Sequence, residues 1–358
     1  MKQANRRTLL RGGGALALGT LLTGQNALAA AALSTTAPTD PYWFVNPELR
    51  QAASKLPKIP PDFTFTDAML PMLRKQMPEG AYAPPSDIQV VQRKIRGLKA
   101  APDVLIYIVN AKPGTPRPAI LYTHGGGLIL GTAYPDRHLL DIARQIDCVI
   151  VSVDYRLAPE TRWQGSTEDD YAGLKWLHDN ADALGADRSR IAVMGESSGG
   201  THAALLALSA RDRGEVPLVL QVLIYPMLDD RTGSSRQVAA PMGVFNWTAG
   251  MNRYGWRSFL GQEPGTADVP VQAVPARATN LAGLPPAFMG VGTIDLFFEE
   301  DVEYARRLVE AGVPTELDVV PGAFHGFDGA APEASIVKEF RAAELNALRR
   351  AFGIPVPI

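Results

Sequence analysis

A chain of 358 residues is too long for one small module and about the right length for one large α/β domain with additions. Its formal net charge of −2, with 20% charged and 46% hydrophobic residues, argues against a disordered chain and against a surface that binds nucleic acid. Cys148 is the single cysteine, so no intramolecular disulfide can form; it lies in the apolar run CVIVSV, where we expect a small buried hydrophobe and not a reactive thiol.

The first 29 residues have the pattern of an export signal. Arg6 and Arg7 precede a moderately apolar stretch, and Ala-Leu-Ala at 27–29 fits an A-x-A cleavage site. The paired arginines predict a bacterial twin-arginine signal, cleavage after residue 29, and a periplasmic or secreted mature protein. A transmembrane anchor is the alternative, but Gly, Thr, Gln and Asn interrupt the apolar stretch too early for a bilayer span. We therefore expect no stable membrane insertion after cleavage.

From residue 30 onward we expect one domain, 30–358, that begins with a cap element near 40–100. This first part is rich in proline, with scattered aromatics and methionines, and predicts a helical extension. Short apolar runs then alternate with longer helical patterns, which predicts an α/β fold with a mostly parallel central sheet and helices on both faces. The predicted strands are VLIYIV (104–109), AILYT (119–123), CVIVSV (148–153), IAVMG (191–195), LVLQVLIY (218–225), AFMGVG (287–292) and ELDVV (316–320).

A second cap element is predicted near 229–265, where the chain is irregular and rich in glycine, proline and aromatic residues. Within it, Trp247, Met251 and Tyr254 fall at i, i+4 and i+7, which predicts one face of a helix. Such a stripe either packs in the core or lines a binding site. We interpret the region as an insertion over one end of the sheet.

Ligands of an open parallel sheet bind beyond the carboxyl ends of its strands, so the residues that follow each apolar run are the first candidates for a site. The run IAVM is followed by GESSGG and then by a helical pattern. The segment 195–199 fits GxSxG, in which a sharp strand-to-helix turn exposes the serine hydroxyl. This context predicts that Ser197 is a nucleophile, and the alternative is a glycine-rich turn with an inert serine.

A serine nucleophile needs an adjacent base, which is usually a histidine held by a carboxylate. Four of the five histidines lie in helical patterns or in a glycine-rich loop: His138, His178, His202 and His124. The fifth is His325, in PGAFHGF directly after the last predicted strand. We predict that His325 is the base; a buried structural histidine is the alternative.

The predicted carboxylate is Asp295, which follows the strand AFMGVG. Glu299, Glu300 and Asp301 are rivals, but they begin a helical pattern, where negative charge suits the helix N-terminus. The chain order serine, aspartate, histidine is that of the α/β-hydrolase fold.

Five motifs occur along the chain in the same order as in a known protein family. They are HGGG (124–127), DYRLAPE (154–160), GESSGG (195–200), DLFFEE (295–300) and HGF (325–327). From roughly residue 88 to 353 the chain resembles the hormone-sensitive-lipase-like carboxylesterases, a branch of the α/β hydrolases. The resemblance implies an esterase with a lid built from N-terminal helices and an insertion after the sixth strand.

The glycine loop HGGG then has a chemical role. We expect the backbone N–H groups of Gly125, Gly126 and Ser198 to form an oxyanion hole, with His124 and Gly127 shaping the loop. A phosphate cradle is the alternative for this loop. Its GxGxxG spacing would need a glycine where the sequence has leucine, at position 130.

The chain departs from the family at Glu196, where Asp or Thr is usual, at Ser198, where Ala is usual, and at Leu296, where Pro is usual. The Glu196 carboxylate either hydrogen-bonds to the glycine loop or alters the charge near the substrate, and the sequence leaves both open. We expect a small-molecule ester as substrate, with a small to medium acyl group, and leave open whether the protein is a monomer or a homodimer. No cofactor and no metal are expected, because this triad needs neither and no HExxH motif or Cys/His cluster is present. A non-catalytic ligand-binding protein, a lactonase and a deacetylase on the same scaffold are the alternatives.

Overall fold

The computed structural model describes residues 40–60, 62–76 and 84–357, and its main compact unit begins at Tyr42. The predicted export signal and its cleavage site lie outside the described residues.

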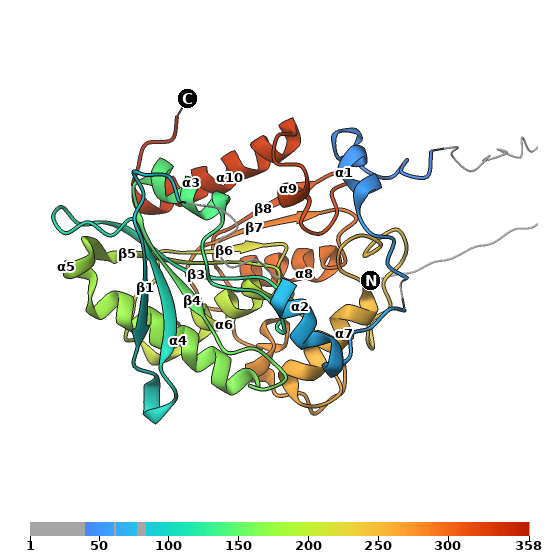
Figure 1. Cartoon of the computed structure of the whole chain (residues 1–358), viewed down its shortest axis with the longest axis horizontal. Helices are drawn as coiled ribbons and strands as arrows, with labels where there is room; N and C mark the ends of the chain where they lie inside the picture. The colour runs from blue at the N-terminus through green and yellow to red at the C-terminus, as the bar shows by residue number, and fades with distance from the viewer. Residues whose placement is uncertain (1–39, 61, 77–83, 358) are drawn as a thin grey trace, which may run out of the picture. The chain divides into compact units, whose positions relative to one another are not determined.

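An eight-stranded sheet forms the centre of the described chain, in the order β1-β2-β4-β3-β5-β6-β7-β8 (Figure 1). Its strands are β1 (Val90–Ile95), β2 (Val104–Val109), β3 (Arg117–Thr123), β4 (Val149–Asp154), β5 (Ala186–Glu196), β6 (Leu220–Ile224), β7 (Ala287–Gly292) and β8 (Thr315–Val320). The pairs β1–β2 and β2–β4 are antiparallel, and the pairs from β4 through β3 to β8 are parallel. The prediction of an α/β fold with a mostly parallel sheet is confirmed, and each of the apolar runs forms a strand.

The helices of the described residues are α1 (Arg50–Lys55), α2 (Leu70–Gln76), α3 (Arg137–Ile146), α4 (Trp163–Asp179), α5 (Ala181–Leu184), α6 (Ser198–Arg213), α7 (Ala249–Leu260), α8 (Phe298–Glu310), α9 (Phe327–Ala330) and α10 (Ser335–Phe352). Short 3-10 turns lie at Pro47–Leu49, Asp67–Met69, Leu98–Ala100, Val271–Ala273 and Pro275–Arg277. Among the described residues, no helix combines the length and the apolar character that a bilayer span requires.

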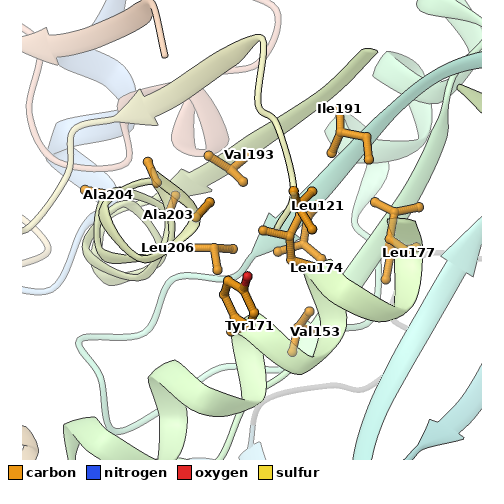
Figure 2. Close-up of a cluster of buried hydrophobic side chains, with 14 of the residues drawn as sticks. Leu121, Val153, Tyr171, Leu174, Leu177, Ile191, Val193, Ala203, Ala204 and Leu206 are labelled. Atoms are coloured by element: carbon orange, nitrogen blue, oxygen red, sulfur yellow. The ribbon is translucent and has the colours of Figure 1, made fainter. Parts of the chain in front are cut away.

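Two hydrophobic cores lie on opposite faces of the sheet, because successive side chains of a strand point to opposite sides. In β3, Leu121 belongs to the core under α4, α6 and α8, whereas Ile120 belongs to the core under α3 and α10 (Figure 1). Figure 2 shows the first of these cores, with Leu174 of α4 and Leu206 of α6 directed at strand side chains such as Leu121. Burial on both faces explains why the strands read as continuous apolar runs.

Cys148 lies in the core on the α3 and α10 side and is fully buried. Burial raises the pKa of its thiol to about 12, so the thiolate does not form near neutral pH. The prediction of a small buried hydrophobe at this position is confirmed.

A third hydrophobic cluster joins α2 to α7, which are distant in sequence (Figure 1). Phe65 stacks edge-on against Tyr254 at 5.9 Å between ring centroids, and Leu70 and Met251 are buried in the same cluster. The N-terminal extension and the insertion after β6 therefore pack on each other.

The predicted helical extension over 40–100 is wrong at its end. Val90–Ile95 is not helical: it is the edge strand β1, paired antiparallel with β2. Four of its six residues, 91–94, are exposed, so the segment has no apolar run that would indicate a strand.

Candidate active site

Ser197 lies at the sharp turn between β5 and α6, as the GxSxG pattern predicts. Its backbone has φ 54° and ψ −122°, which is a strained conformation for a residue with a side chain. The turn is held by two backbone hydrogen bonds, one to the last residue of β6 and one to the segment that follows it. The Ser197 N–H donates to the Ile224 carbonyl at 2.8 Å, and the Ser197 carbonyl accepts from the Met227 N–H at 2.9 Å.

The glycines around this serine are required by close backbone packing. A Cβ at Gly199 would overlap the Thr123 carbonyl oxygen at the end of β3, and a Cβ at Gly195 would overlap the Gly199 carbonyl. The Thr123 hydroxyl donates to that same Gly199 carbonyl at 2.8 Å. The nucleophile turn therefore lies directly against the end of the neighbouring strand.

The structure brings Ser197, His325 and Asp295 together, although the predicted serine and histidine are 128 positions apart. The Ser197 Oγ lies 2.9 Å from His325 Nε2, and His325 Nδ1 lies 2.9 Å from Asp295 Oδ2. Asp295 is 1% exposed, while Ser197 and His325 are each 8% exposed. The carboxylate thus orients the imidazole from a buried position, and the serine side of the imidazole faces the cavity.

Further contacts hold Asp295 and His325 in place. The second carboxylate oxygen of Asp295 accepts from the Phe297 N–H at 3.0 Å. The His325 ring packs edge to face against the rings of Tyr225 and Phe297, with ring centroids 4.9 and 5.1 Å apart. The Asn246 amide donates to the His325 carbonyl at 2.7 Å. Sequence reasoning assigned no role to Tyr225, Phe297 or Asn246. Tyr225 ends the predicted strand run 218–225, and Phe297 lies in the motif DLFFEE.

The three rival acids lie in the first turn of α8, as predicted, but two of them are buried. Glu300 Oε1 accepts from the Leu228 and Asp229 N–H groups, so it holds the loop after β6. Burial raises the pKa of Glu300 and of Asp301 well above their usual range. Burial therefore works against the negative charge expected of Glu300 and Asp301 at the helix N-terminus, whereas Glu299 is exposed there.

The glycine loop follows β3 and lies beside the nucleophile turn. An ideal Cβ at Gly125 would stand 3.2 Å from the Glu196 carbonyl oxygen and 3.5 Å from Ser197 Cβ. Gly126 has φ +129°, and its carbonyl accepts from the Leu130 N–H at 2.9 Å, which folds the loop back on itself. Ser198 begins α6, so its N–H belongs to the first turn, where N–H groups lack intrahelical partners. The predicted oxyanion donors therefore lie on two segments that pack against each other.

His124 stabilises the glycine loop, of which it is the first residue. Its ring Nδ1–H donates to the Gly125 carbonyl at 2.8 Å, and burial lowers its pKa to about 4, so the ring is neutral near pH 7. The ring stacks on Tyr155 at 4.2 Å, and the Tyr155 hydroxyl donates to the His124 carbonyl at 2.6 Å. Tyr155 also stacks on His202, which is itself buried and paired with Asp170 at 2.6 Å.

A cavity of about 460 Å³ opens onto these groups. It is lined by the glycine loop, Ser197, His325, Glu196 and several aromatic residues, Trp247 among them. A Cβ at Gly127 would overlap the Trp247 ring, so the insertion lies directly on the glycine loop. The predicted helix face is wrong for Trp247, because α7 begins only at Ala249. Trp247 lines the cavity and is also buried in the same cluster as Met251 and Tyr254.

Comparisons with known proteins agree with this geometry. A family model described as alpha/beta hydrolase fold matches residues 120–329. Esterase LipI of Mycobacterium tuberculosis is 37% identical over 238 residues, which cover 65% of this chain and 72% of the relative. Carboxylesterase NlhH of the same species is 37% identical over 246 residues, covering 65% of this chain and 74% of the relative. Among solved structures, a bacterial heroin esterase is similar with a TM-score of 0.76 and 36% identity, over 86% of this chain and 98% of that one.

Proposed function

The chain belongs to the alpha/beta-hydrolase family, and from this premise we propose that it is a serine carboxylesterase acting on small to medium acyl esters. The observation that carries the proposal is the hydrogen-bonded series from Ser197 through His325 to Asp295 at the wall of the cavity. A volume of about 460 Å³ suits a small ligand.

The reaction follows from the positions of these groups. Ser197 Oγ attacks the ester carbonyl while His325 Nε2 takes its proton, and Asp295 stabilises the imidazolium that forms. The carbonyl oxygen becomes an oxyanion, which accepts hydrogen bonds from the N–H groups of Gly125, Gly126 and Ser198.

The same groups complete the cycle. The imidazolium gives its proton to the leaving alcohol, and the acyl group stays on Ser197 as an ester. Water then attacks this acyl-enzyme, His325 takes the proton of the water, and the carboxylic acid leaves as the serine regains its hydrogen. The neutral His124 ring holds the loop carbonyl of Gly125 and takes no proton in these steps.

Hydrolysis of p-nitrophenyl acetate, butyrate and octanoate tests this proposal. We expect the protein to release p-nitrophenol from at least the acetate or the butyrate, and Ser197→Ala to lower kcat by at least about a thousandfold. Ser54→Ala, at an exposed position of α1, is the matched control. Equal rates of hydrolysis by the parent protein and Ser197→Ala would reject the triad. No hydrolysis by the parent protein would leave the non-catalytic ligand-binding alternative.

We also propose that the protein is exported by a twin-arginine route and acts outside the bacterial cytoplasm. The support is the sequence pattern of Arg6 and Arg7 before an apolar stretch with a small-residue end. Replacing both arginines by lysine is expected to keep esterase activity in the cytoplasmic fraction of the producing cell. Undiminished activity in the periplasm of this variant would refute the proposal.

A further inference from the structure

Glu196 lies in the wall of the active-site cavity, one position before the nucleophile. Its Cγ is 3.6 Å from the point where a Cβ on Gly125 would stand, so the side chain runs beside the glycine loop. The Tyr122 hydroxyl lies near its carboxyl group. Asp136, the N-cap of α3, lines the same cavity and is close enough to Glu196 to repel its charge. Two carboxyl groups therefore face the space in which a substrate binds.

Among the described residues that line the cavity, none is a lysine or arginine that could pair with these carboxyl groups. The wall instead contains the rings of Tyr122, Tyr134, Tyr225 and Trp247. Aromatic faces attract cations, and clusters of such rings are the usual receptor for quaternary ammonium groups.

The surroundings of Glu196 disfavour the negative charge on its carboxyl group. Burial, with Asp136 and Asp328 nearby, raises the pKa of its carboxyl to about 8, against the weaker opposing effects of His138 and Tyr122. His138 is already paired with Glu344 at 2.8 Å. A positive group that entered the cavity would supply the countercharge that Glu196 lacks.

We propose that this cavity selects esters that carry a positive charge, with an ammonium group bound against Glu196 and Asp136 and among the aromatic rings. Such substrates are preferred over neutral esters of the same shape, and esters that carry a carboxylate are the poorest. The inference rests on the proposed esterase function and names the substrate class of that site.

The preference for cationic over neutral esters depends on pH. The groups around Glu196 determine whether it rises or falls as the pH increases. Glu196 binds a cation best when ionised, so the preference rises with pH through about 8 as the carboxyl loses its proton to solvent. The titratable groups around it are Tyr122 of β3, Asp136 and His138 of α3, Asp328 of α9, Tyr155 after β4 and Tyr225 after β6. The pKa of His138 is raised to about 9 by Glu344, and loss of its proton removes a positive charge, which acts in the same direction.

The test compares acetylcholine with its neutral isostere 3,3-dimethylbutyl acetate, and with 4-acetoxybutanoate as the anionic ester. The expected kcat/KM for acetylcholine exceeds that for the neutral ester by about tenfold or more near pH 8, and this ratio grows between about pH 6 and pH 9. The acid–base steps of the triad are common to both substrates and cancel in the ratio. The anionic ester is expected to give the lowest kcat/KM.

Two variants test whether Glu196 and Asp136 cause the preference for acetylcholine. Glu196→Gln keeps the shape of the side chain, and Asp136→Asn keeps a residue that caps helices well, so each is expected to lower the ratio while the protein stays folded. With Glu196→Gln the ratio is also expected to lose its rise with pH. Asp182→Asn, an exposed carboxylate paired with Arg188 on the surface, controls for the change in net charge and is expected to keep the ratio.

The outcomes separate this inference from the esterase proposal. Hydrolysis of the neutral ester with equal or lower kcat/KM for acetylcholine overturns the inference alone. A preference that neither Glu196→Gln nor Asp136→Asn reduces also overturns it. If none of the three esters and none of the p-nitrophenyl esters is hydrolysed, the proposed function itself fails.

Discussion

Asp295 reaches the nucleophile only through His325, because its carboxylate contacts the imidazole and the imidazole contacts the serine. Asp295→Asn keeps the shape of the side chain but no longer favours the tautomer with the proton on Nδ1. We expect kcat to fall by about ten-thousandfold, with little change in KM. Steady-state kinetics on p-nitrophenyl butyrate measures both kcat and KM.

The rival acids provide the control for that prediction. Glu299→Gln removes the exposed acid in the first turn of α8 and is expected to keep the parent kcat. If Asp295→Asn keeps full activity instead, another acid must orient His325.

At the scale of single residues, sequence reasoning identified the polar groups that meet but not their supports. Ser197, His325 and Asp295 each follow a predicted strand, and the carboxyl ends of parallel strands meet at one edge of the sheet. Tyr225 and Asn246 carry no comparable local pattern. Their contacts with His325 depend on how the segments after β6 fold back over the sheet.

At the scale of elements, the glycine loop depends on a residue that the motif HGGG does not include. Gly131 has φ +107°, and a Cβ there would overlap both the Gly125 carbonyl and the His124 ring. Gly131→Ala is therefore expected to displace the loop and with it the proposed oxyanion donors. We expect kcat to fall by about a hundredfold or more, measured on p-nitrophenyl acetate.

A second glycine serves as the matched control for the loop. Gly329 lies in α9, and a Cβ there would meet no atom within 4 Å. Gly329→Ala is expected to leave kcat near that of the parent. A Gly131→Ala protein with the parent kcat would show that the loop tolerates this crowding, and would weaken the assignment of the oxyanion hole.

Strand β1 was misjudged from the sequence, and its position in the sheet explains why. It is the first strand of the sheet and has the single neighbour β2, so residues such as Arg93 and Lys94 remain exposed. Charged side chains are common on edge strands, where they discourage pairing with other chains. Because these residues are charged, the segment lacks the apolar run by which a strand is recognised in the sequence.

At the scale of the whole molecule, buried acids make stability depend on pH. Burial raises the pKa of Glu300 well above its ordinary value of 4.5, although it accepts backbone hydrogen bonds from Leu228 and Asp229. A raised folded-state pKa contributes stability below the ordinary value, and that contribution is lost as the pH rises. Glu300→Gln keeps an oxygen acceptor and removes the titration.

We therefore expect the free energy of unfolding of Glu300→Gln, relative to the parent, to increase as the pH rises from about 5 to about 9. Urea unfolding at several pH values measures the difference. Glu299→Gln, in the same turn but exposed, is expected to show no such trend. A difference that does not change with pH would mean that Glu300 does not titrate in this way.

The sequence by itself determined the α/β class, the parallel strands and the order of serine, aspartate and histidine along the chain. These features have local signatures, because strands buried on both faces must be apolar and a nucleophile turn must contain glycines. Only the tertiary structure decided that Trp247 lines the cavity, that Val90–Ile95 is an edge strand, and that Glu196 faces a space without lysine or arginine among the described lining residues. Each of these depends on contacts between segments distant along the chain, and burial and charge become defined only when such segments pack together.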